Sequence, residues 1–238
     1  MEKKLVDIFT KHGELLADTA RSFIRKSISH KPVVKFKGDG SPVTNYDKEL
    51  EAKNPNAEFT WLIDPIDGTL AFLTGIPVFT TLISLLHNGS PIIGIIEAPM
   101  TKDRWIGRKN QKTIHNAQLV KTSNCRVMSE AIMSTSSPDY YKAENINILR
   151  NLQSLTKQTV YGGSSTAYAQ IAGGRIDFGI DANFDIHDFL PLVPIIEGAG
   201  GQLTDWQGQA LSQQSGTENM LATANSYLHD EILEKINK

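Results

Sequence analysis

The sequence is organised around Trp61-Leu62-Ile63-Asp64-Pro65-Ile66-Asp67-Gly68-Thr69. Residues 59–63 are apolar and predict a buried strand. Because proline cannot donate to a sheet ladder, we expect this strand to end at Pro65. Gly68 permits a tight turn, and Thr69 can cap a helix that begins at the next residue. The stretch therefore predicts a strand, a turn and a helix start in direct succession.

Two carboxylates, Asp64 and Asp67, fall at this junction of strand and helix. Carboxylate oxygens are ligands that hard divalent cations prefer, and the free amides of a helix start attract phosphate. A capped Asp-Pro turn explains two aspartates alone, but the six residues Asp-Pro-Ile-Asp-Gly-Thr after a strand favour a catalytic role. The pattern predicts metal-assisted chemistry on a phosphate ester.

Composition narrows the class of protein. The 238 residues are 40% hydrophobic and 21% charged, with a formal net charge of −2, which argues against a nucleic-acid-binding surface. The single cysteine, Cys125, excludes an intramolecular disulfide framework. The charged N-terminus does not resemble a signal peptide, and residues 80–100 are interrupted by Asn88-Gly89 and do not predict a membrane span. We expect a cytoplasmic protein.

Hydrophobic periodicity places the remaining elements. Helices are predicted over residues 2–28 (with an interruption near Gly13), 145–155, 166–172, 188–198 and 228–236, and after Thr44. Strands are predicted over residues 79–86, 92–97, 104–107, 131–137, 159–161, 175–181 and 202–206. Asn88-Gly89 indicates a hairpin between the first two of these strands, and the Lys/Gly/Ser-rich residues 35–44 indicate a loop. The irregular alternation favours a layered α/β fold over a barrel.

A third carboxylate, Asp188, precedes the apolar run 189–196 at a predicted helix start. Taken alone it is explained by an Asp cap, worth about 1 kcal/mol. Combined with the Asp64 to Thr69 motif and with Ile-Glu-Gly-Ala-Gly-Gly over 196–201, it resembles the inositol monophosphatase superfamily. Residues 37–44, 134–138, 161–163 and 188–201 are most similar to the bacterial histidinol-phosphate phosphatase branch of that superfamily.

The resemblance implies an alternating αβαβα sandwich of the inositol monophosphatase/fructose-1,6-bisphosphatase type. Residues 1–238 would form one phosphatase domain, with an N-terminal α+β part over about 1–128 and a C-terminal α/β part over about 129–238. The implied activity is Mg²⁺-dependent hydrolysis of a small phosphate monoester by a metal-activated water, with two or three ions bound. Family members are commonly homodimers, and neither nucleic acid nor a membrane is an expected partner.

The resemblance also implies roles for individual residues. The implied metal ligands are Asp64, the carbonyl of Ile66, Asp67 and Asp188. Asp47 and Thr69 would orient and deprotonate the attacking water. The implied phosphate and substrate contacts are the amides of Gly68 and Thr69, together with Ser164 and Asp181. Lys37 and Asp39 belong to a loop that would help to close the site, where Asp39 could support a third metal ion.

Two features depart from the family pattern. The family places a Gly-Glu-Glu segment, which supplies a metal ligand, between the regions of Asp47 and Asp64, and no such segment is present. Either it is deleted, or the printed sequence omits a loop between Lys53 and Asn54. Glu51 and Glu58 are the nearby acidic substitutes.

The second departure is Ser164, where the histidinol-phosphate branch usually has an acidic residue suited to a cationic amino alcohol. L-histidinol phosphate is the leading substrate prediction. Inositol-1-phosphate, or another small sugar or nucleotide phosphate, is an alternative. A weakly active binding or regulatory protein is a further alternative if the metal-loop glutamate is absent.

Overall fold

The computed structural model describes residues 3–27, 34–36, 42–44 and 57–237. The amphipathic N-terminal segment forms one long helix, α1 (Lys3–Ser27). The predicted interruption near Gly13 is wrong. Gly13 is buried within the helix, and a Cβ there would lie 2.8 Å from Ile95 and 3.4 Å from Trp61. The absent side chain lets α1 lie directly on the sheet beneath it.

Residues 57–119 form a six-stranded sheet in which each strand pairs antiparallel with the next. Its strands are β3 (Phe59–Asp67), β4 (Thr80–His87), β5 (Ser90–Ala98), β6 (Asp103–Arg108), β7 (Ile114–His115) and β8 (Gln118–Leu119). The hairpin predicted at Asn88-Gly89 is confirmed, because both residues have positive φ, 48° and 77°, as a type I′ turn requires.

Strand β3 continues through Pro65 to Asp67, so the predicted strand end at Pro65 is wrong. The ladder between β3 and β4 shifts register between Asp64 and Asp67, and Pro65 lies inside this bulge, where no amide donor is needed. Helix α2 (Thr69–Thr74) follows, with Gly68 as its N-cap at φ 81°. Thr69 is therefore the first helical residue and not the cap that was predicted.

A second sheet has the strand order β10-β9-β11-β13-β12. Its strands are β9 (Ile132–Thr135), β10 (Gln158–Tyr161), β11 (Phe178–Asp181), β12 (Gln202–Thr204) and β13 (Met220–Thr223). Strands β9, β10 and β11 run parallel, whereas β13 pairs antiparallel with β11 and β12. Four of these strands were predicted. Strand β13, which lies between β11 and β12, was not.

The remaining helices are α3 (Ile146–Leu155), α4 (Ser164–Ala172), α5 (Ile186–Phe189), α6 (Leu192–Ala199) and α7 (Ser226–Ile236), with 3₁₀ turns η2 (Met128–Glu130) and η3 (Pro138–Tyr140). The single helix predicted over 188–198 is wrong, because the chain divides there into α5 and α6 beside Pro191. Within the predicted loop, β1 (Val34–Phe36) pairs with β2 (Pro42–Thr44). The helix predicted after Thr44 lies outside the described residues.

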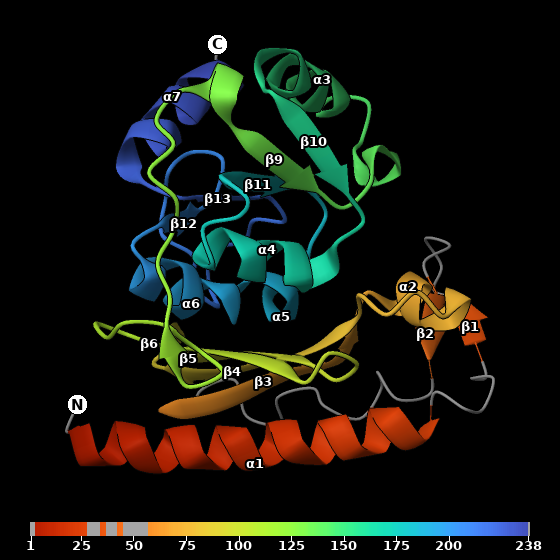
Figure 1. Cartoon of the computed structure of the whole chain (residues 1–238), viewed down its shortest axis with the longest axis vertical. Coiled ribbons are helices and arrows are strands. Elements are labelled where there is room, and N and C mark those ends of the chain that lie inside the picture. The colour runs from red at the N-terminus through yellow and green to blue at the C-terminus, as the bar shows by residue number, and fades with distance from the viewer. Residues whose placement is uncertain (1–2, 28–33, 37–41, 45–56, 238) are drawn as a thin grey trace.

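The elements stack as five alternating layers (Figure 1). Helix α1 covers the outer face of the six-stranded sheet, α4, α5 and α6 lie between the sheets, and α3 and α7 cover the outer face of the second sheet. The largest apolar cluster fills the space around the central helices, with Leu82, Ile96, Phe189 and Ile195 fully buried. This is the predicted αβαβα sandwich. None of the helices in the described part of the chain is long and apolar enough to span a membrane.

Candidate active site

Three carboxylates meet beside the central helix layer. Asp64, Asp67 and Asp188 each offer an oxygen, and these oxygens lie within 4.8 Å of one another. Asp64 and Asp67 come from the end of β3, and Asp188 comes from α5, more than a hundred residues later. Asp67 is buried, whereas Asp64 and Asp188 are partly exposed. Three anionic oxygens so close together repel one another unless a cation lies between them, and oxygen donors suit a hard divalent ion.

The turn that carries Asp64 is fixed by its own hydrogen bonds. The amide of Ile66 donates to Asp64 Oδ1 at 3.0 Å, and Thr69 Oγ1 donates to the Ile66 carbonyl at 3.2 Å. From the neighbouring strand, Thr81 Oγ1 donates to the Pro65 carbonyl at 2.8 Å. The bulge therefore holds a defined shape. A carbonyl oxygen has two lone pairs, so the hydrogen bond from Thr69 does not by itself prevent the Ile66 carbonyl from binding a cation.

Asp67 accepts hydrogen bonds from two residues that the sequence analysis did not identify, Thr80 and Ser165. Its Oδ2 accepts hydrogen bonds from the Ser165 amide at 2.6 Å and from Thr80 Oγ1 at 3.0 Å. Burial raises the pKa of Asp67, although these hydrogen bonds oppose that shift. A neighbouring cation would favour the ionised form. No sequence signal identifies Thr80 and Ser165, because they lie 13 and 98 residues from Asp67.

Asp188 is the third residue of α5, not the residue at its N-terminus that was predicted. Asp185 is the N-cap, and its amide donates to Asp188 Oδ2 at 2.9 Å in a capping box. This hydrogen bond fixes the orientation of the Asp188 carboxylate. His187 Nε2 lies 3.8 Å from Asp185 Oδ2.

Gly68 and Ser164 are in direct contact. Ser164 begins α4 with a positive φ of 47°, and its Oγ lies 2.2 Å from the place that a Cβ on Gly68 would occupy. Only glycine fits at position 68, for this reason and because its own φ is 81°. The start of α4 therefore lies against the start of α2.

Asp181 lies at the end of β11 and is 1% exposed. Its two oxygens accept four hydrogen bonds, from Thr135 Oγ1 (3.0 Å), the Ser136 amide (2.8 Å), Ser136 Oγ (3.2 Å) and Tyr168 Oη (2.6 Å). Desolvation outweighs these bonds and raises the pKa of Asp181 to about 6. Burial raises the pKa of the Tyr168 phenol, and the nearby charges of Asp181 and Asp67 raise it further, so the three groups share one polar region.

Lys37, Asp39, Asp47 and Glu51 lie outside the described residues, as does the junction of Lys53 and Asn54. Glu58 is described and is exposed. It pairs with His87 Nε2 at 3.3 Å at the start of β3. Six residues of extended strand, about 20 Å, separate it from Asp64. Glu58 therefore does not replace the missing acidic ligand.

Comparisons with protein families, curated proteins and solved structures all find phosphatases of the same kind. Residues 3–238 match the inositol monophosphatase family. The bifunctional phosphatase IMPL2, chloroplastic, of Arabidopsis thaliana is 35% identical over 261 residues, covering 97% of this chain and 75% of that protein. A histidinol-phosphatase of Mycobacterium tuberculosis is 29% identical over 185 residues, covering 74% and 69%. A solved inositol monophosphatase of Zymomonas mobilis superposes with a TM-score of 0.88 at 30% identity, covering 100% of both chains.

Proposed function

Since this chain belongs to the inositol monophosphatase family and is a metal-dependent phosphoric monoester hydrolase, we propose that Mg²⁺ and a small phosphate monoester bind at Asp64, Asp67 and Asp188. The observation that carries this proposal is the approach of their three carboxylate oxygens to within 4.8 Å. Two distant parts of the sequence supply these residues, and packing of an apolar core alone gives no reason to bring three negative charges together.

The donor set fits Mg²⁺. Asp64, Asp67, Asp188 and the carbonyl of Ile66 are all hard oxygen ligands, and the described residues near them offer no thiolate that would favour a softer metal. When bound, Mg²⁺ neutralises phosphate charge and makes a bound water more acidic. Two or three ions are proposed, as the family resemblance implies.

The chain's own groups orient the reactants. Thr69 is the first residue of α2, and its amide has no partner within the helix, so it is suited to bind a phosphate oxygen beside Gly68. The Thr69 hydroxyl is held by the Ile66 carbonyl next to the cluster. There it would position the attacking water together with Asp47. Catalysis then comes mainly from orientation and from stabilisation of the phosphoryl charge.

L-histidinol phosphate is the proposed leading substrate. A histidinol-phosphatase is among the relatives, and Asp181 and Asp185 give the surroundings of the cluster a negative potential that favours a cationic amino alcohol. Inositol-1-phosphate is the second candidate, because the Zymomonas mobilis structure is an inositol monophosphatase and Ser164 carries no charge. A homodimer remains a prediction from the resemblance, and a cytoplasmic location remains a prediction from the single cysteine and the charged N-terminus.

Phosphate release from both esters, with Mg²⁺ and then with excess EDTA, tests the proposal. We expect release that requires Mg²⁺ and is faster with L-histidinol phosphate. Asp64→Asn should lower the rate by at least about 100-fold, beyond what loss of a group behind a ligand costs. Circular dichroism and thermal unfolding of the variant control for folding. A wild-type protein that releases phosphate from neither ester would instead support a binding or regulatory role.

A further inference from the structure

Two buried hydroxyl groups lie behind Asp67. Thr80 at the start of β4 is 0% exposed, and Ser165 in the first turn of α4 is 4% exposed. Thr80 Oγ1 lies 3.0 Å from Asp67 Oδ2 and 2.5 Å from Ser165 Oγ, while the Ser165 amide reaches the same Oδ2 at 2.6 Å. The three residues form a closed ring of polar contacts that joins the end of β3 to the central helix layer.

The chemistry of the groups sets the direction of these hydrogen bonds. A carboxylate only accepts, so the single hydroxyl proton of Thr80 points to Asp67 Oδ2. With the Thr80 proton directed there, Thr80 Oγ1 accepts from the hydroxyl of Ser165, which also lies close enough to stabilise the Asp67 carboxylate. The result is a one-way relay from Ser165 through Thr80 to Asp67. Asp67 Oδ2 thus accepts from both the Thr80 hydroxyl and the Ser165 amide, and the Gly68 amide and the Ser165 hydroxyl also stabilise this carboxylate. Because the two fixed donors meet at Oδ2, Oδ1 is the oxygen of Asp67 better placed to bind a cation.

We propose that Thr80 and Ser165 are positioning residues for the metal site, and that their hydroxyl relay turns Oδ1 of Asp67 towards Asp64 and Asp188. This inference rests on the function proposed above for the three carboxylates. The relay has a clear physical task, because a buried carboxylate without fixed donors can rotate and present either oxygen. Groups that orient a metal ligand from behind typically change metal affinity by about 10–100-fold.

The relay also links the metal site to α4. Ser165 follows Ser164, whose hydroxyl packs on Gly68, so the first turn of α4 contacts both Asp67 and the residue after it. Removing the relay should therefore weaken metal binding. It should leave the KM for the phosphate ester at saturating Mg²⁺ close to the wild-type value, because neither hydroxyl is exposed to a substrate.

Calorimetric titration of the metal-free protein with Mg²⁺ tests the inference without relying on activity. Thr80→Val keeps the shape of the side chain but removes the hydroxyl, and we expect Mg²⁺ affinity to fall by about 10–100-fold. Thr80→Ser should restore most of the affinity. Ser165→Ala should have a smaller effect than Thr80→Val, because Thr80 can still donate to Asp67.

Thr113→Val is the matched control. Thr113 is 0% exposed and donates to the Ile195 carbonyl at 2.7 Å, so the variant loses a buried hydroxyl bond of the same kind outside the cluster. It should bind Mg²⁺ like the wild type. Urea unfolding of every metal-free variant separates a loss of stability from a loss of metal affinity.

The outcomes separate this inference from the proposed function. If the wild type binds Mg²⁺ and Thr80→Val binds it equally well, or if Thr80→Ser loses as much affinity as Thr80→Val, the inference is overturned and the proposed function stands. If Thr80→Val does not fold, an unchanged affinity in Ser165→Ala overturns the inference. A wild type that binds no Mg²⁺ overturns both.

Discussion

Asp181 shows how burial and hydrogen bonding compete at one side chain. The unfolded chain leaves this carboxyl near its ordinary pKa of 3.8, whereas burial in the folded protein raises it to about 6. The folded protein therefore holds this proton more tightly than the unfolded chain does. Above pH 6 the buried charge lowers stability by about 3 kcal/mol, and protonation between pH 6 and 3.8 progressively removes that cost.

Asp181→Asn removes this titration. We expect the free energy of unfolding of the metal-free wild type to rise relative to that of the variant as the pH falls from 7.5 to 5, by about 1.4 kcal/mol, roughly half of the full effect. Urea unfolding at a series of pH values measures the difference. A difference between the two proteins that does not change with pH would show that Asp181 is not buried as a charged group.

The sequence identified some site residues and not others for a physical reason. Asp64 and Asp67 are part of a short motif whose turn chemistry is local, and Asp188 precedes an apolar helix. Thr80 and Ser165 carry common hydroxyls, and only the packing of α4 against β4 makes them neighbours of Asp67.

Helix α6 packs on the six-stranded sheet through a pair of glycines. Gly94 on β5 is in register with Gly107 on β6. A Cβ on Gly94 would lie 1.9 Å from the Pro191 carbonyl oxygen, and one on Gly107 would lie 2.3 Å from the backbone of Pro194. The helix backbone thus rests directly on two strands, and this close contact fixes the segment that follows Asp188.

Gly94→Ala should be strongly destabilising. The new methyl group meets backbone rather than a flexible side chain, so we expect a loss of at least about 3 kcal/mol, the upper end of the usual cost of overpacking. Gly173→Ala is the matched control. Its φ is −85° and its nearest neighbours lie 3.6–3.8 Å from the added Cβ, so its effect should stay within about 0.5 kcal/mol. Equal free energies of unfolding in urea for the two variants would contradict a close contact between Gly94 and the Pro191 backbone.

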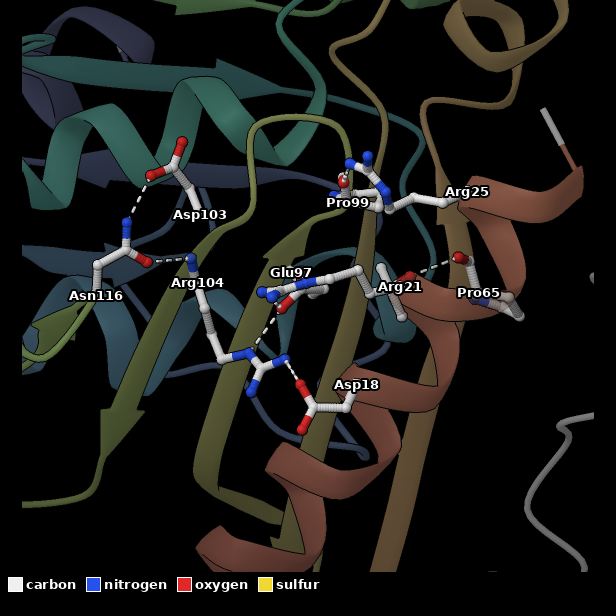
Figure 2. Close-up of polar contacts among 10 residues, drawn as sticks. Asp18, Arg21, Arg25, Pro65, Glu97, Pro99, Asp103, Arg104 and Asn116 are labelled. Carbon is white, nitrogen blue, oxygen red and sulfur yellow. Dashed lines mark hydrogen bonds and ion pairs between the residues drawn. The ribbon is translucent and has the colours of Figure 1, made fainter. Parts of the chain in front are cut away.

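Helix α1 is attached to the sheet by a buried ion-pair network (Figure 2). Glu97 on β5 is 0% exposed and accepts from Arg21 of α1 through both oxygens, with Arg21 Nη2 at 2.9 Å. Arg104 Nε lies 2.6 Å from Glu97 Oε2, and its Nη2 lies 2.6 Å from Asp18 Oδ1. Nearby, Arg25 donates to the Pro99 carbonyl at 3.0 Å.

Glu97→Ala should cost about 1.5–3 kcal/mol, because it removes the charged hydrogen bonds to two partly exposed arginines, one of which keeps Asp18 as a partner. Glu218→Ala removes half of the exposed Lys142–Glu218 pair and should cost less than about 1 kcal/mol. Urea unfolding measures both. A loss below 1 kcal/mol for Glu97→Ala would show that the Glu97 ion pairs do not hold α1 on the sheet.

Periodicity predicted most helices and strands because amphipathic segments report their own buried face. It missed β13, whose four residues Met-Leu-Ala-Thr are all buried and show no alternation of apolar and polar side chains. It also merged α5 with α6, because the apolar run 189–196 was given more weight than Pro191, which could have signalled the break. The bulge that carries Pro65 depends on pairing with β4, which lies outside the motif itself.

The five-layer arrangement was predicted from the family resemblance and not from periodicity, because the order of strands in a sheet depends on pairing between distant segments. The Gly-Glu-Glu segment of the family, which supplies an acidic metal ligand, is a question of which residues the whole chain contains. The Arabidopsis relative aligns over 261 residues, more than the 238 present here, so it contains residues with no counterpart in this protein. These extra residues are compatible with both alternatives for the Gly-Glu-Glu segment, a deletion or a loop that the printed sequence omits.

The central claim is that Asp64, Asp67 and Asp188 share a divalent cation. A crystal of the protein soaked in Mn²⁺, with anomalous scattering data, tests it most directly. We predict an anomalous peak in contact with a carboxylate oxygen from each of the three residues, at the roughly 2.0–2.6 Å typical of hard cations bound to oxygen. An anomalous map with no peak at this cluster, or with peaks only elsewhere on the protein, would contradict the claim.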